Sequence, residues 1–220
     1  MRRGFRRAER DLPMRFKNNR TGQRGFSLVE LLMVVAISLV IAAVAIPNVM
    51  RAMGAYRLRS GVHAMAQIVQ RSRMESMRDN RVGHIATQWN WDGSAWTNTI
   101  FIDTNGNWWQ DASEQVSYRL PSYMYNSWGW GPSTATMNLD FTPQNTWNLP
   151  SFDARGIPCL FSTPTNCQSI VGGQPVGFVS YLVYWEDSWW SGNNIRFAAV
   201  SVSPTGKMRT YTWDGNSWQQ

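Results

Sequence analysis

The chain has 220 residues, a formal net charge of +7, two cysteines and two histidines. Residues 1–25 hold nine Arg or Lys and two acidic residues, so they carry the whole net charge, and residues 26–220 hold twelve basic and twelve acidic residues. Overall basicity is therefore no evidence for a nucleic-acid partner. The 195 residues after position 25 are enough for one domain with a helix, a sheet and a core.

The boundary between the basic segment and an apolar one is the most specific feature of the chain. It reads Arg24-Gly25-Phe26-Ser27-Leu28-Val29-Glu30, and residues 31–46 carry no charge. A basic segment ahead of an apolar one is the layout of an export signal, and Lys and Arg hold their side in the cytoplasm. Because Gly25 stands before the apolar run and not after it, the pattern predicts cleavage ahead of that run and a new N-terminus at Phe26.

Residues 26–46 reach the ~20 residues that a helix needs to cross a bilayer core. Glu30 is the exception within this run, since a carboxylate near the edge of the core costs about 1 to 3 kcal/mol. Cleavage would create a partner for it, the α-amino group of Phe26, and in a packed assembly Glu30 of one subunit can pair with Phe26 of its neighbour. The alternative is a glutamate that reaches the interface in a plain signal anchor.

The run Gly25-Phe26-Ser27-Leu28-Val29-Glu30-Leu31-Leu32 resembles the class III signal of type IV pilins and pseudopilins. The resemblance implies cleavage between Gly25 and Phe26 by a prepilin peptidase, methylation of the Phe26 amine, and an assembly role for Glu30. It also implies a single-pass protein of the bacterial inner membrane with a periplasmic C-terminal domain, whose partners are other pilins or pseudopilins and an inner-membrane assembly platform. Pro47 falls where many such proteins kink their long helix.

We expect the helix to continue over residues 47–79 as an amphipathic segment. Apolar or small residues recur there at spacings of three and four: Val49, Ala52, Met53, Tyr56, Val62, Met65, Ile68, Val69 and Ser72. The opposite face is rich in arginine. Two interpretations of that face stay open, a surface for phosphate or anionic lipid headgroups and an ordinary solvated face.

Residues 80–220 change to short alternating runs separated by Gly, Asn, Asp and Pro, which is typical of an all-β segment. The predicted strands are 82–91, 96–103, 115–120, 136–141, 176–185, 195–202 and 207–213. Asp92-Gly93 and Asp214-Gly215 are hairpin turn signals, each between two tryptophans: Trp91 and Trp96, and Trp213 and Trp218. The predicted fold is α+β, a long N-terminal transmembrane helix packed on an antiparallel sheet.

The soluble part is similar to one branch of the pilin superfamily, the GspH/FimT pseudopilins. The similar segments are Ile100 to Asn107 with Asp111 and Glu114, then residues 152–158, and Val200 to Arg209. The Trp-rich loops at 123–150 and 185–194 match poorly. The resemblance implies a structural subunit and no enzyme.

Two members of that family imply different functions. One is the minor pseudopilin of type II protein secretion, a subunit near the tip of a short periplasmic filament. The other is a DNA-binding minor pilin with a Gly-Arg-x-Arg motif, which Gly206-Lys207-Met208-Arg209 matches with Lys in the first basic position. Lys207 and Arg209 can both neutralise phosphates. A third hypothesis, from another class, is a surface adhesin that stacks sugars on its 13 tryptophans.

Asp103, Asn105, Asn107, Asp111 and Glu114 stand at positions 1, 3, 5, 9 and 12 of a calcium loop of the EF-hand kind. Trp108 replaces the glycine of position six, and the flanking segments read as strands. The other interpretation is a polar turn whose Asp and Asn side chains bond their own backbone.

Cys159 and Cys167 bracket a short loop, and two cysteines in an exported protein favour a disulfide over free thiols. Closing so short a loop contributes ~2 to 3 kcal/mol by the chain-entropy model. His63 and His84 have no spaced partners for zinc. A Ser-His-Asp site built on His84 stays open as a minor alternative. Adjacent tryptophans such as Trp108-Trp109 and Trp189-Trp190 must point to opposite faces if extended, so we expect one of each pair to be exposed.

Overall fold

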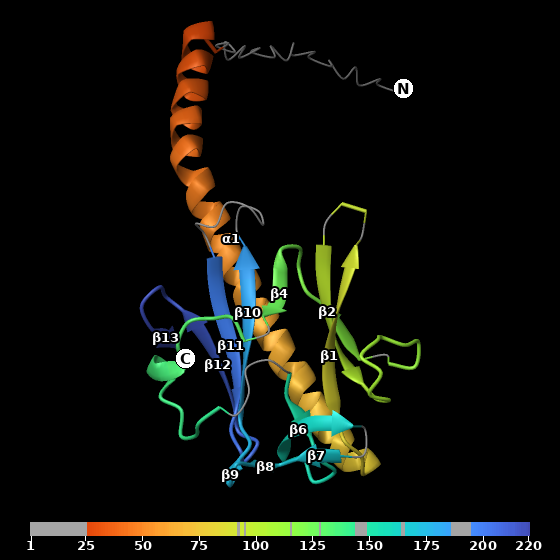
Figure 1. Cartoon of the computed structure of the whole chain (residues 1–220). Coiled ribbons are helices and arrows are strands. Elements are labelled where there is room, and N and C mark those ends of the chain that lie inside the picture. The colour runs from red at the N-terminus through yellow and green to blue at the C-terminus, as the bar shows by residue number, and fades with distance from the viewer. Residues whose placement is uncertain are drawn as a thin grey trace, which may run out of the picture. The chain divides into compact units, whose positions relative to one another are not determined.

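The computed structural model describes residues 26–220, apart from 92, 95, 115, 128, 144–148, 164–165 and 186–194. The chain divides into two compact units, Met1–Ile46 and Pro47–Gln220. A single helix, α1 (Leu28–Asp79), contributes to both (Figure 1). Pro47 lies inside this helix and not at its end.

In the first unit, the described residues are the two before α1 and its turns up to Ile46. Their Leu, Ile and Val side chains are exposed, and the acidic residue of the first turn is Glu30. A carboxylate in a first helical turn is favoured because the unpaired N–H groups there carry partial positive charge.

The second unit holds the rest of α1 and two larger antiparallel sheets. The three-stranded sheet has the order β1-β2-β3, and the five-stranded sheet has the order β13-β12-β11-β10-β4. The strands of the first are β1 (His84–Trp91), β2 (Trp96–Asp103) and β3 (Ser117–Arg119). Those of the second are β4 (Met124–Ser127), β10 (Phe178–Trp185), β11 (Ile195–Val202), β12 (Met208–Trp213) and β13 (Trp218–Gln219).

Five shorter strands complete the unit. They are β5 (Ser151–Phe152), β6 (Pro158–Thr163), β7 (Asn166–Gln168), β8 (Ile170–Val171) and β9 (Gln174–Pro175). The first three form one small sheet and the last two form another. The long helix followed by antiparallel sheets confirms the predicted α+β class.

The main core lies between the second part of α1 and the sheets. The helix contributes Leu58, Val62, Met65, Ile68 and Val69, all buried. The apolar stripe predicted upstream of Leu58 is not buried in this unit: Val49, Met53 and Tyr56 are exposed. The sequence pattern is continuous, but the buried apolar side chains of the helix begin only at Leu58.

The five-stranded sheet is covered on its other face as well. A second core cluster there joins Val179, Tyr181, Ala199 and Tyr211 to Met137 of the 3-10 helix η1 (Thr134–Met137) and to Trp218. Burial on both faces explains why β10 is a near-continuous apolar run and not an alternating one.

The predicted strand at 136–141 is wrong. Residues 134–137 form η1, in which the Oγ of Ser133 accepts the backbone N–H of Ala135, and Asn138 ends the turn at φ 49°. Met137 then packs on the sheet face as part of a covering loop. The alternation of apolar and polar residues here comes from one-sided burial of irregular chain. Strands β4 to β9 were not predicted. The predicted hairpin turn at Asp214-Gly215 is confirmed, because β13 pairs with β12 through Trp218 and Trp213.

Arg73 links α1 to two distant turns. Its Nε donates to the carbonyl of Gly156 (2.9 Å) and its Nη1 to the carbonyl of Gly206 (2.9 Å). Gly206 has φ +80°, and a Cβ at that position would meet the guanidinium group of Arg73. The glycine therefore serves both the turn conformation and the close approach of the arginine.

We expect Gly206→Ala to destabilise the domain more than Gly173→Ala does, by ~1 to 3 kcal/mol in the free energy of unfolding. Gly173 has a matching φ of +78° but nothing within 4 Å of its added Cβ, so it reports the backbone strain alone. Urea unfolding of the mature chain in detergent measures both. The extra destabilisation of Gly206→Ala over Gly173→Ala should vanish when Arg73→Ala is added to each variant. If the two glycine substitutions lowered the free energy of unfolding equally, the role given to Arg73 would be contradicted.

Candidate functional site

The N-terminal segment combines one charged side chain with a long apolar surface. Phe26 is exposed, α1 begins at Leu28, and Leu31 N–H bonds the carbonyl of Ser27 (3.1 Å). By length and composition α1 contains a stretch able to cross a membrane. Exposed apolar surface on this scale requires a cover of lipid or of neighbouring helices. Gly25, the other side of the predicted cleavage site, lies outside the described residues.

Asp103 organises the turn that follows β2. Its carboxylate accepts the backbone N–H groups of Asn105 (3.2 Å), Gly106 (2.6 Å) and Trp108 (2.9 Å). Gly106 and Trp108 take positive φ values of 73° and 67° within this turn. This is a polar turn whose side chain bonds its own backbone.

Glu114 and Asp111 close the same turn from its far end. Glu114 accepts the backbone N–H of Thr104 (2.7 Å) through Oε1 and that of Asp111 (3.1 Å) through Oε2. Asp111 accepts both side-chain amides, from Asn105 (2.7 Å) and Asn107 (2.9 Å). The five residues of the calcium hypothesis therefore do lie on one turn.

The oxygens of that turn are already engaged. Both carboxylate oxygens of Asp103 and of Glu114 accept hydrogen bonds, and the side-chain carbonyls of Asn105 and Asn107 accept the backbone N–H groups of Asn107 and Trp109. In the part of the chain that the structure describes, no group of three or more His, Cys, Asp or Glu is placed to hold a metal ion.

His84 lies in a closed aromatic pocket at the start of β1. Its ring stacks on Phe161 with centroids 4.1 Å apart and meets the edge of Trp108 at 4.3 Å. Nδ1 is 2.8 Å from the Oγ of Ser151, and Nε2 has no hydrogen-bond partner among the described residues. Burial lowers the pKa of His84 to about 4, and the charge of Asp103, its cross-strand neighbour, opposes that shift only in part.

The Ser-His-Asp alternative is met only in part. Ser151 pairs with His84, but His84 forms no hydrogen bond with Asp103 among the described residues. Ser151 is buried, so its hydroxyl does not face a substrate. Asp103 directs its carboxylate to three backbone N–H groups of its own turn. The pair instead joins β1 to β5 in the interior.

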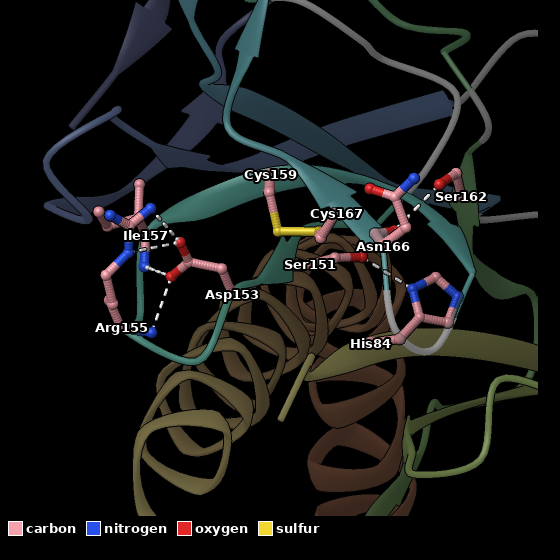
Figure 2. Close-up of a disulfide and its surroundings, with 9 residues drawn as sticks. All are labelled: His84, Ser151, Asp153, Arg155, Ile157, Cys159, Ser162, Asn166 and Cys167. Carbon is pink, nitrogen blue, oxygen red and sulfur yellow. Dashed lines mark hydrogen bonds and ion pairs between the residues drawn. A yellow bond between two sulfur atoms is a disulfide. The ribbon is translucent and has the colours of Figure 1, made fainter. Parts of the chain in front are cut away.

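A disulfide lies next to this pair. Cys159 on β6 is bonded to Cys167 on β7, with Cα atoms 5.3 Å apart, and Ser151 pairs with Cys159 in the sheet. Figure 2 shows the disulfide between the His84–Ser151 pair and the turn of Asp153. Burial opposes ionisation of Asp153, but hydrogen bonds from the Ile157 backbone and from Arg155 hold its pKa below the ordinary value.

The candidate DNA-contact residues follow the Gly206 turn. Lys207 is exposed, and Arg209 is half-buried on β12 opposite Ser201. The Lys207 backbone N–H bonds the Oγ of Ser203 (3.1 Å). Within the described residues, no ion pair is formed by the side chain of Lys207 or Arg209.

The expectation that one tryptophan of each adjacent pair is exposed is wrong for Trp108-Trp109. Trp108 and Trp109 are both exposed, because Trp108 at φ 67° is not in an extended strand, and the opposite-face rule does not apply. Trp189 and Trp190 lie outside the described residues. Sequence reasoning placed Arg73 on the arginine-rich helix face and missed its bonds to the Gly156 and Gly206 carbonyls. Its position, four residues after the buried Val69, was the available signal that it stands at the margin of the packed face.

Comparison with known proteins finds one similarity. The protein-family profile described as "Prokaryotic N-terminal methylation motif" matches residues 20–46. No curated protein and no solved structure matches the chain. The chain therefore carries a type IV prepilin-like motif, which supports a pilin- or pseudopilin-like structural subunit anchored through its N-terminus.

The lowered pKa of His84 predicts a loss of stability in acid. The pKa of His84 is 6.5 in the unfolded chain and about 4 in the folded chain, so the unfolded chain binds the proton more readily. The contribution of neutral His84 to the free energy of unfolding is therefore complete above about pH 6.5 and is lost as the pH falls toward about 4. Between these pH values the free energy of unfolding should fall by up to ~1.4 kcal/mol per pH unit. Urea unfolding at several pH values measures it.

His84→Phe should remove this component of the pH dependence, whereas His63→Gln, at an exposed helix position, should leave it in place. An identical pH slope in the wild type and in His84→Phe would show that other groups cause the acid sensitivity.

Proposed function

We propose that the chain is a minor pseudopilin of the type II protein secretion pseudopilus, with a structural and assembly role. The observation that carries the proposal is the Gly25-Phe26 junction with Glu30, directly ahead of an exposed apolar helix and inside the matched methylation motif. In this proposal a prepilin peptidase cleaves between Gly25 and Phe26, and the Phe26 amine is methylated. The apolar segment sits in the bacterial inner membrane, and the β-rich domain is periplasmic.

The choice of the GspH/FimT branch rests on three segments of the second unit. The segments resembling that branch coincide with β2 and its polar turn, with the β5–β6 turn, and with the β11–β12 turn. One residue shapes each turn. Asp103 and Asp153 accept backbone N–H groups of their own turns, and Gly206 takes a positive φ in the third. The resemblance thus falls on structural turns, which supports a shared fold.

Glu30 is the proposed assembly residue. As a subunit leaves the bilayer and joins the filament, the buried carboxylate gains the Phe26 ammonium of a neighbour, while the apolar helix exchanges lipid for other helices. An unpaired buried charge is costly, so pairing would direct the subunit into register.

We expect Glu30→Ala to leave membrane insertion and leader cleavage intact but to reduce incorporation into filaments several-fold. Co-purification of partner subunits with the variant measures incorporation, and a gel shift of about 25 residues reports cleavage. Glu30→Gln should behave like Glu30→Ala because it also lacks the charge. Ser38→Ala, in the same apolar stretch, should assemble normally, since Ser38 bonds only the Val34 carbonyl among the described residues. Normal assembly of both Glu30 variants would exclude the assembly role.

A DNA-binding minor pilin of a type IV pilus is the second candidate. The observation in its favour is that the side chains of Lys207 and Arg209 form no ion pair within the described residues, and that Lys207 is exposed. Against it stand the balanced charges of residues 26–220 and the separate structural reason for Gly206.

The secretion role predicts no salt-sensitive DNA binding by the mature chain at low salt. A DNA-uptake role predicts binding that Lys207→Ala/Arg209→Ala abolishes, with the slope of log K against log salt smaller by about 2. Arg59→Ala/Arg71→Ala is the matched control, because it removes two charges from the basic helix face. Binding lost only in that control would assign phosphate contact to the helix. Fluorescence anisotropy over a salt series measures all three proteins.

A further inference from the structure

Six aromatic rings gather at one end of the second unit. We call them the aromatic end: Trp89, Trp91, Trp96, Tyr125, Trp130 and Trp185. They come from β1, β2, β4 and β10 and from the loop after β4, so both larger sheets contribute.

The rings contact one another in two groups. Trp91 and Trp96 face each other across the β1–β2 hairpin with centroids 5.4 Å apart. Trp89 meets Tyr125 at 5.4 Å, the indole N–H of Trp185 donates to the Tyr125 hydroxyl (3.0 Å), and Trp130 stacks on Trp185 at 6.2 Å. The second group therefore bridges the two sheets.

Much of this aromatic surface is open. Trp91 is 56% exposed, Trp130 52% and Trp96 48%. Aromatic side chains of this size usually dominate a core or an interface, and indoles combine a large apolar body with one N–H donor. Three exposed tryptophans at one end of the unit, two of them in direct contact, indicate a contact surface.

Contacts along α1 fix which end of the unit this is. Arg57 Nη1 lies 3.5 Å from the Tyr184 hydroxyl, next to Trp185, whereas Arg73 bonds the Gly206 carbonyl beyond the far end of β11. Gly61, between them, lies beside Leu182. Strand β10 thus runs antiparallel to the helix, and its Trp185 end lies near Arg57, on the Pro47 side of Gly61 and Arg73.

The β1–β2 hairpin lies at this end too. Gly83, just before β1, bonds Phe152 and lies against Ser72, so β1 starts near the last turns of α1. Trp89, near its other end, reaches Tyr125 and hence Trp185. Figure 1 shows the hairpin end of β1 and β2 and the arrowhead of β10 at the same end of the unit.

That end is where the chain joins its apolar segment, because Pro47 directly follows Ile46. Tryptophan and tyrosine are enriched at bilayer interfaces, where the ring body meets acyl chains and the N–H or O–H meets headgroups. The aromatic end therefore belongs to the end of the second unit that is covalently joined to the apolar segment.

We propose that the aromatic end binds the headgroup region of the bilayer that anchors residues 26–46, so that the domain rests on the membrane before assembly. The inference rests on the membrane anchoring in the proposed function. It adds a second, peripheral lipid contact made by the soluble domain. Joining a filament then requires the aromatic end to leave the lipid.

The sequence supplies a direct test, because the first tryptophan of the chain is Trp89. All tryptophan emission therefore comes from the second unit. The full chain is reconstituted in phosphatidylcholine vesicles with bromine at a shallow acyl position and in unbrominated vesicles. Flotation reports anchoring separately, and bromine quenching of tryptophan emission reports contact of the domain with lipid.

We expect clear quenching in the brominated vesicles, with the quenched fraction roughly halved by Trp91→Phe/Trp96→Phe. Trp108→Phe/Trp109→Phe is the matched control: it also removes two exposed indoles, but from the polar turn at the other end, and should not lower the quenched fraction. Comparing the tryptophan emission of the wild-type chain in the two kinds of vesicle tests the proposal even if a variant fails to fold.

Chain that floats with its vesicles but shows equal emission in both lipids would overturn the proposal. So would quenching that Trp91→Phe/Trp96→Phe leaves unchanged. An emission change induced by oligosaccharides, lost in that variant and found without bromine quenching, would assign the aromatic end to sugar and also overturn the lipid contact. Failure to float would instead refute the membrane anchoring of the proposed function.

Discussion

The structure depends on one helix that must satisfy two different environments. Up to Ile46 its side chains are apolar apart from Glu30 and Ser38, and nearly all are exposed, so that part is stable only in lipid or against other helices. From Leu58 onward, one face is buried by the sheets of its own chain. The same element is therefore an anchor in one part and one wall of a core in the other. A subunit built this way can change the surroundings of its first part without unfolding the second.

The parts predicted from sequence were those with a strong periodic or chemical signal. Long strands such as β10 and β11 carry dense β-branched and aromatic runs, and the helix keeps its apolar spacing from Val62 to Val69. The matched methylation motif covers the Gly25-Phe26 junction, where charge, glycine and hydropathy change at one point. Each of these signals is local, and local signals can be followed without knowing the fold.

The parts that escaped prediction depend on distant contacts. Residues 134–141 alternate like a strand, but Met137 is buried as part of a loop that covers a sheet. His84 reads as the first residue of a strand, while Ser151 and Phe161, which make its pocket, come from 67 residues or more downstream. Short strands such as β5 and β8 have two residues each and no period to detect.

Gly206 shows how a motif can have a purely structural origin. In the Gly-Lys-Met-Arg run, the glycine is required because its φ is positive and because Arg73 packs against it. These two structural reasons favour glycine at this position whether or not the protein binds DNA. Only Lys207 and Arg209 can distinguish the functions, and the backbone of Lys207 is itself part of the turn through Ser203. The discriminating information in the motif is therefore the charge of two side chains.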